Sequence, residues 1–152
     1  MDIYTYLKTD HQKVAKLLDE VEQTTERAAK TRTDLFAKIK RELTLHAKAE
    51  EKTFYAALKN NEKASDLLPE AYAEHTLIEQ LLQELDNEDC TTEAWTGKFK
   101  VLKENIEHHV EEEEGEIFSK ARKALTNQQA AELANLMEAE KERLQGSGIL
   151  SR

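Results

Sequence analysis

Two histidine–glutamate pairs recur in the sequence with the same spacing and similar apolar neighbours. His46 and Glu50 form the first pair, and His109 and Glu113, each 63 positions later (46 to 109, 50 to 113), form the second. In both pairs the glutamate follows the histidine by four positions, so the imidazole and the carboxylate lie on one face of an α-helix. Apolar residues at helical spacing turn that face toward a protein core. These residues are Ile39, Leu43 and Phe54 around the first pair and Leu102, Ile106 and Ile117 around the second.

Two single histidines, His11 and His75, lie on similar apolar stripes. They are 64 positions apart, and each follows an apolar residue by four positions and precedes another by three. The chain therefore reads as one helical hairpin used twice, each copy with a lone histidine and then His-x-x-x-Glu. Burying an imidazole or a carboxylate without a partner is costly, and a metal ion supplies the partner. The candidate metal ligands are His11, His46, Glu50, His75, His109 and Glu113.

The elements that must position these residues are long helices. One Pro and four Gly among 152 residues, with 35% charged residues, favour helices over strands. Asp2, Ser65 and Thr126 can cap the first, third and fifth helices, and Thr31 and Thr33 mark the break after the first. The apolar periodicity predicts helices over residues 2–29, 34–60, 65–85, 93–124 and 126–145.

The order of these helices predicts the fold. Long amphipathic helices joined by short turns form an up-down-up-down four-helix bundle, so we expect an all-α protein of this kind with a short C-terminal fifth helix. Leu133, Met137 and Leu144 are expected to face inward on that fifth helix. We predict one domain over residues 1–145 and a flexible tail over residues 146–152.

The six candidate ligands are expected in one layer of the bundle core. A helix rises about 1.5 Å per residue, and counting from the expected helix ends puts all six at a similar depth. Their nitrogen and oxygen atoms suit iron, with manganese or zinc as alternatives. Bundle cores made of facing His and Glu hold two such ions. With carboxylate and oxo or hydroxo bridges, two irons would keep open positions for dioxygen, peroxide or nitric oxide.

The composition argues against several other classes of protein. The net charge of −9 disfavours a nucleic-acid partner and an anionic membrane surface. No apolar run is long enough to span a membrane, and no signal-peptide pattern opens the sequence. Cys90 is the single cysteine, so an internal disulfide cannot form. We expect a cytoplasmic protein that is a monomer or a weak dimer.

These motifs resemble those of the hemerythrin-like (HHE cation-binding) proteins over roughly residues 1–124. The resemblance is carried by Asp10-His11, by His46-Ala-Lys-Ala-Glu50-Glu51-Lys-Thr-Phe54, by Glu74-His75 and by His108-His109-Val-Glu-Glu-Glu113-Glu114-Gly-Glu-Ile-Phe118. It implies a four-helix bundle with a non-haem di-iron centre and bridging carboxylates, held by the six residues named above. The cofactors it implies are two iron ions with an oxo or hydroxo bridge.

Two positions depart from the oxygen-carrying members of the family. Ala71 stands where they have a further histidine, and Glu114 stands where they have an aspartate. These departures disfavour reversible oxygen carriage. Two His-x-x-x-Glu motifs are more similar to bacterial relatives linked to nitric oxide stress and iron–sulfur repair.

Three hypotheses remain from the sequence. The first is a di-iron protein that binds or reacts with a small oxidant, in oxidative or nitrosative stress or in iron homeostasis. The second is a non-catalytic iron-binding or iron-sensing module that acts through a protein partner, and the third is a helical bundle without metal. The sequence leaves open whether a further ligand comes from Glu51, Glu114, His108 or one of the tyrosines Tyr4, Tyr6, Tyr55 and Tyr72.

Overall fold

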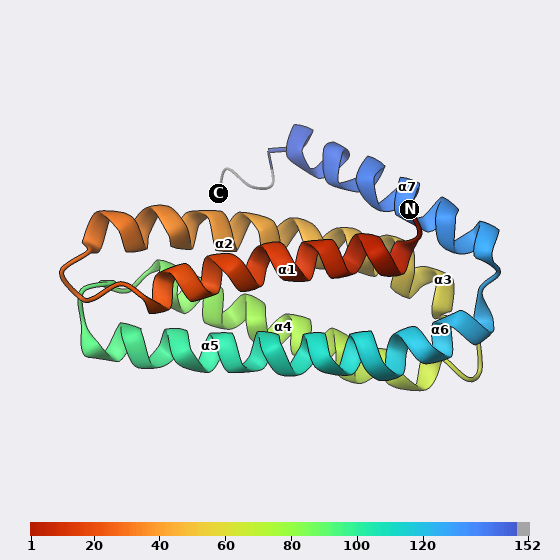
Figure 1. Ribbon diagram of the computed structural model, residues 1–152, viewed down its shortest axis with the longest axis horizontal. Helices are drawn as coiled ribbons and strands as arrows, with labels where there is room; N and C mark the ends of the chain where they lie inside the picture. The colour runs from red at the N-terminus through yellow and green to blue at the C-terminus, as the bar shows by residue number, and fades with distance from the viewer. Residues whose placement is uncertain (149–152) are drawn as a thin grey trace.

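The computed structural model describes residues 1–148, and these form an up-down-up-down bundle of four long helical arms (Figure 1). The predicted all-α bundle is confirmed. Figure 1 shows α1 running antiparallel to α2, and α4 antiparallel to α5, with the two hairpins packed against each other. The four main helices are α1 (Ile3–Glu22), α2 (Ala29–Glu50), α4 (Leu68–Asp86) and α5 (Glu93–Glu112). Within residues 1–148 no helix is long and apolar enough to cross a membrane.

Two of the arms contain a π-helical turn that was not predicted from the sequence. The π turn η1 (Glu51–Tyr55) follows α2 and leads into α3 (Ala56–Leu58). The π turn η3 (Glu113–Ile117) follows α5 and leads into α6 (Phe118–Ala124). A π turn holds an extra residue, so neighbours in sequence can both face the core. Phe54 and Tyr55 are both buried after Glu50, as are Ile117 and Phe118 after Glu113.

The break between the first two helices was predicted at the wrong place. α1 ends at Glu22, and α2 already begins at Ala29, so Thr31 and Thr33 lie inside α2. Thr33 is tolerated there because its hydroxyl donates a hydrogen bond to the carbonyl of Ala29, 2.8 Å away. The turn instead contains Thr24, whose hydroxyl donates to the carbonyl of Val21.

The other helix starts agree with the sequence in part. Asp2 caps α1 by accepting a hydrogen bond from the backbone N–H of Thr5, at 2.9 Å. Ser65 was predicted to cap the third helix, and this is wrong. It begins a short 3₁₀ turn, η2 (Ser65–Leu67), and the side chain of Asn61 accepts the hydrogen bonds of the preceding backbone.

The fifth helix, α7 (Asn127–Gly146), agrees within one residue with the predicted range 126–145. It begins with the expected capping box, in which Thr126 and Gln129 accept each other's backbone N–H groups. α7 packs on α1 and α2 (Figure 1). The inward residues Leu133, Met137 and Leu144 are confirmed as buried. Most of the predicted tail, residues 149–152, lies outside the described residues.

The hydrophobic core consists of two clusters on either side of a polar layer. One cluster contains Leu7 and Ala71, and the other contains Val14 and Ile78. Along α1, His11 falls between Leu7 and Val14, and along α4 His75 falls between Ala71 and Ile78. The fold therefore places the histidines at mid-height in the bundle, with apolar packing above and below.

Candidate metal centre

The structure brings all six candidate ligands together in the polar layer. α1 contributes His11, α2 contributes the pair His46 and Glu50, α4 contributes His75, and the junction of α5 with η3 contributes the pair His109 and Glu113. The histidines are 4–8% exposed, and both glutamates are 0% exposed. Six ionisable side chains at this degree of burial require partners inside the protein. The predicted layer is confirmed, and their role as metal ligands stays a prediction.

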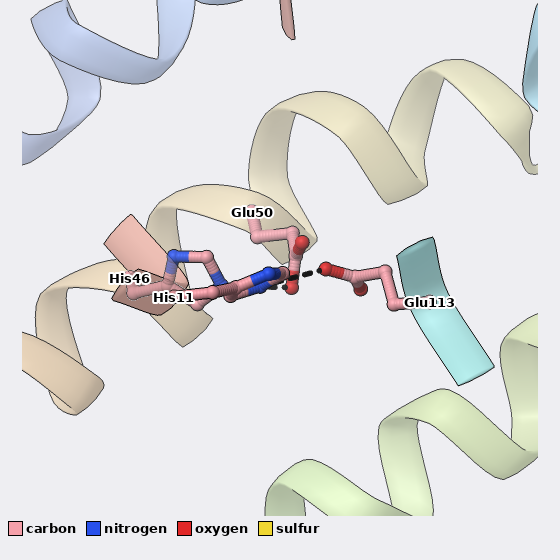
Figure 2. A group of neighbouring side chains, drawn as sticks. All are labelled: His11, His46, Glu50 and Glu113. Carbon is pink, nitrogen blue, oxygen red and sulfur yellow. Dashed lines mark ion pairs between the residues drawn. The ribbon is translucent and has the colours of Figure 1, made fainter. Parts of the chain in front are cut away.

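Each glutamate lies between a histidine of its own helix and a lone histidine of the other hairpin. Glu50 Oε1 is 3.2 Å from His75 Nε2 and 3.5 Å from His46 Nε2. Glu113 Oε1 is 3.2 Å from His11 Nε2, and its Oε2 is 3.6 Å from His109 Nε2. Figure 2 shows His11, His46, Glu50 and Glu113 pointing toward one another from three different helical segments. Both hairpins therefore contribute to both ends of the site.

Several inward-facing atoms in this layer have no hydrogen-bond partner. They are Nε2 of His11 and of His46, both carboxylate oxygens of Glu50, and Oε1 of Glu113. Their ligand atoms fall into two groups, each within 4.8 Å: His11, His46, Glu50 and Glu113 in one, and Glu50, His75 and His109 in the other. Buried nitrogen and oxygen atoms that converge in this way fit cations, which would satisfy them. Since Glu50 belongs to both groups, it could bridge two ions.

The other ring nitrogen of each of the four buried histidines is held by an outer carboxylate. His11 Nδ1 is 2.7 Å from Glu114, His46 Nδ1 2.8 Å from Asp10, His75 Nδ1 2.7 Å from Glu51, and His109 Nδ1 2.6 Å from Glu74. A carboxylate that accepts the Nδ1–H bond leaves Nε2 free to bind a metal and fixes the orientation of the ring. All four imidazoles therefore present Nε2 to the centre of the bundle.

These four outer carboxylates follow the twofold repeat. Asp10 and Glu74 precede the lone histidines and hold the second histidine of their own hairpin. Glu51 and Glu114 follow the inner glutamates and reach the lone histidine of the opposite hairpin. Both of these glutamates are possible metal ligands by sequence, and the structure gives them this outer position instead. The arrangement was not predicted, although the repeated adjacency of acid and ligand is visible in the sequence.

The electrostatics of the layer favour extra positive charge. Burial by itself lowers the pKa of His46, but Glu50 and Asp10 outweigh it and raise that pKa to about 10. In the same way Glu50 and Glu51 overcome burial and raise the pKa of His75 to about 9. Burial raises the pKa of Glu113, but its histidine neighbours outweigh this and hold the pKa well below the usual range. Without metal, protons supply the positive charge that these carboxylates attract.

Tyr55 also reaches the layer, from η1. Its hydroxyl donates a hydrogen bond to Glu113 Oε2, and its ring stacks on His75 with 5.4 Å between centroids. Burial, with Glu50 and Glu113 nearby, raises the pKa of the Tyr55 hydroxyl well above its usual value, so it stays a donor. His108, by contrast, is 61% exposed at its side chain and pairs with Glu112 at 3.2 Å. His108 therefore lies outside the polar layer, with its side chain in solvent.

A cavity of about 150 Å³ opens onto the same layer between α2 and α4. Its wall includes all four buried histidines. Its apolar lining includes Val14, Ile78, Leu82 and Ile106, and residues such as Ala47 and Thr76 stand on the two helices that flank it. A small, mostly apolar space beside the imidazoles can admit a molecule of a few atoms.

Comparisons with known proteins agree with the site and the fold. The family model for the hemerythrin HHE cation binding domain matches residues 2–121. A curated relative, a DNA nickase of Nostoc sp. (strain PCC 7120), is 26% identical over 145 aligned residues. The aligned region covers 95% of this chain but only 40% of the relative. The crystal structure of a hemerythrin HHE cation binding domain-containing protein from Mycobacterium kansasii superposes with a TM-score of 0.83 at 24% identity, over 98% of this chain and 90% of that one. At that identity the likeness shows the fold, whereas the family match covers most of this chain and all six buried His and Glu residues. The chain therefore belongs to the hemerythrin HHE cation-binding domain family.

Proposed function

We propose that the protein binds two iron ions in the polar layer and that the metal centre reacts with a small oxidant such as dioxygen, peroxide or nitric oxide. The observation that carries this proposal is the set of buried, unpartnered Nε2 and carboxylate oxygen atoms, backed by a carboxylate on every Nδ1. His11 and His46 would hold one ion, and His75 and His109 the other. Glu50 and Glu113 would bridge them, because each contacts a histidine of both groups. When bound, an iron pair supplies the redox chemistry.

The residues of this chain prepare the site for such a small molecule. The cavity reaches the imidazoles but is bounded by aliphatic side chains such as Val14, Ile78 and Ile106. An apolar pocket of this size favours a small, weakly hydrated molecule over a charged metabolite. The burial of the layer limits the access of bulk water, and the outer carboxylates keep the imidazoles oriented during any change at the metals.

A second function, a non-catalytic iron-binding or iron-sensing module, is favoured by the position of the site. The layer separates the two hydrophobic clusters, so its occupancy should control the stability of the whole bundle. A DNA-nicking activity is not carried over from the Nostoc relative. This chain spans 40% of that protein, and its net charge of −9 repels DNA.

Metal analysis of protein purified without a metal-affinity step tests the proposal. We expect close to two irons per chain and near-ultraviolet absorption from an oxo or hydroxo bridge. Glu50→Ala and Glu113→Ala should each empty the site, whereas Glu116→Ala, the same change at an exposed glutamate of η3, should keep it filled. Unchanged iron content in the two ligand variants would contradict the assignment.

The choice between the two functions depends on reactivity. Spectra of the iron-loaded protein should change on addition of peroxide or nitric oxide, whereas a sensing module would give a thermal shift without such changes. Ala47→Phe should fill the cavity and slow the spectral change without lowering iron content. Ala73→Phe, at an exposed position of α4, is the matched control and should leave the rate unchanged.

A further inference from the structure

Two outer carboxylates at equivalent positions, Asp10 and Glu74, have different surroundings. Both hold the Nδ1 of the histidine in their own hairpin's His-x-x-x-Glu motif, His46 at 2.8 Å and His109 at 2.6 Å. The repeat therefore gives the two metal positions the same inner residues and the same kind of outer acid. The charged neighbours of Asp10 and Glu74, however, differ.

On the first hairpin, Asp10 is neutralised by a lysine from α7. Lys141 Nζ lies 2.5 Å from Asp10 Oδ2, the oxygen that also bonds His46. The two side chains are 12% and 14% exposed, and Lys141 also lies against the ring of Tyr6, 4.8 Å from its centroid. An ion pair this well shielded from water is screened far less than one on the surface.

On the second hairpin, Glu74 has acidic neighbours. Its Oε2 is 3.7 Å from the exposed imidazole of His108, and a ligand atom of Glu70 and one of Glu112 lie in the same group within 4.8 Å. Among residues 1–148, no Lys or Arg forms an ion pair with Glu74. Within these residues, no permanently charged cation therefore neutralises Glu74 as Lys141 neutralises Asp10.

We infer that Lys141 makes the two metal positions unequal, with the weaker position at His11 and His46 and the tighter one at His75 and His109. A carboxylate on Nδ1 makes the imidazole a better donor and adds negative charge near the cation. Lys141 offsets both effects on one side only, acting through Asp10 and His46 as a positioning residue. The inference rests on the proposed two-metal site. It also assigns a role at that site to α7, which lies beyond residues 2–121 matched by the family model.

Stepwise metal binding to the metal-free protein tests this inference. Anaerobic calorimetric titration with Fe(II), repeated with Co(II) and followed by visible absorption, should show two unequal steps. Lys141→Met should tighten the weaker step on the order of tenfold and bring the two steps together. Lys141→Arg should restore the difference. Lys52→Met is the matched control, because Lys52 also pairs with α7, at Glu140, but is 64% exposed and does not contact Asp10.

A comparison of the two acids gives a second test that leaves Lys141 in place. Asp10→Asn and Glu74→Gln keep an oxygen to accept the Nδ1–H bond but remove the charge. Glu74→Gln should weaken metal binding more, because Lys141 already cancels Asp10 and the freed lysine can extend into water. When Lys141 is also replaced with Met, Asp10→Asn and Glu74→Gln should weaken metal binding by the same factor.

The outcomes separate this inference from the proposed function. If Lys141→Met binds two metals with unaltered affinities, or with both affinities weakened together, the role of Lys141 is overturned and the metal site stands. The same holds if two metals bind and Asp10→Asn and Glu74→Gln weaken metal binding equally in the presence of Lys141. A protein that binds no metal under any of these conditions would overturn the proposed function first.

Discussion

Tyr55 and Phe118 occupy equivalent positions in the two hairpins, 63 residues apart, yet only Tyr55 carries a hydroxyl, and that hydroxyl meets Glu113 across the bundle. Both side chains are 0–1% exposed; Tyr55 is the last residue of the π turn η1, and Phe118 directly follows the π turn η3. The ring of Phe118 packs on Tyr4 and Phe54, so a ring without a hydroxyl fits this kind of position. The hydroxyl of Tyr55 is therefore a feature of the polar layer and not of the packing.

Replacing Tyr55 with Phe should destabilise the metal-free protein more than the metal-loaded one. The substitution keeps the ring but removes a donor from a fully buried carboxylate, which costs about 1–3 kcal/mol. A bound cation would satisfy Glu113 in place of the hydroxyl and recover most of that loss. Urea denaturation with and without metal measures the difference. Tyr72→Phe, at a residue 37% exposed, is the control, and an equal loss in both metal states of Tyr55→Phe would contradict this view.

The polar layer could be predicted from the sequence because its residues repeat. An imidazole and a carboxylate rarely occupy positions that otherwise hold core residues. Because the pair occurs a second time at a fixed offset, His46 and His109 could be identified as equivalent. Helical rise alone then placed the lone histidines at the same depth. These arguments need only local periodicity, which helices follow closely.

The π turns and the first helix break were beyond that argument. A strict 3.6-residue period cannot accommodate adjacent inward residues, although the neighbours Phe54 and Tyr55, and again Ile117 and Phe118, indicated an inserted residue. The break was misplaced because threonine is a weak helix former in both segments. The position of the turn depends instead on Arg32, whose guanidinium donates hydrogen bonds to the hydroxyl and the carbonyl of Thr24.

Lys141 could not be connected to the site from sequence. It lies 131 positions from Asp10, on a helix outside the repeat, and nothing local distinguishes it from the other lysines of the chain. The outer carboxylates themselves were visible as acids adjacent to ligands. Which histidine each of them holds depends on helix rotation, and only the assembled bundle fixes it.

Metal loading should stabilise the fold strongly. A ligand that binds only the folded state adds about 2.7 kcal/mol at a free concentration of one hundred times its Kd. The buried lone pairs of Glu50 would gain partners at the same time. Thermal unfolding with Fe(II) under anaerobic conditions, or with Zn(II), should give a higher Tm that a chelator reverses. A Tm that rises equally in Glu50→Ala would show that the metal acts elsewhere.

The metal-free protein should lose stability as the pH rises above neutrality. The folded-state pKa values of His46 and His75, about 10 and about 9, lie above the ordinary value of 6.5, so above pH 6.5 the folded state holds more protons than the unfolded state. That contribution is complete below pH 6.5 and disappears as the pH rises through the folded-state values. Urea denaturation with a chelator at pH 7 and pH 9.5 measures it. His46→Gln should flatten the dependence, and a stability that rises over this range would mean that the two buried imidazoles do not hold these protons.

Arg32 should matter for the fold and not for the metal. It is 3% exposed, and its guanidinium donates to the carbonyls of Thr24 and Cys90 and to the hydroxyl of Thr96, which ties the two turns at one end of the bundle. Arg32→Met keeps the aliphatic stem but removes the charged donor that joins the two turns through these hydrogen bonds, so it should lower the free energy of unfolding by about 2–4 kcal/mol. Arg27→Met, at an exposed arginine of the same region, should change it little. Iron content per folded chain should stay unchanged in both, because the guanidinium contacts none of the His and Glu residues of the layer. Loss of iron from folded Arg32→Met would show that this end of the bundle and the metal centre are coupled.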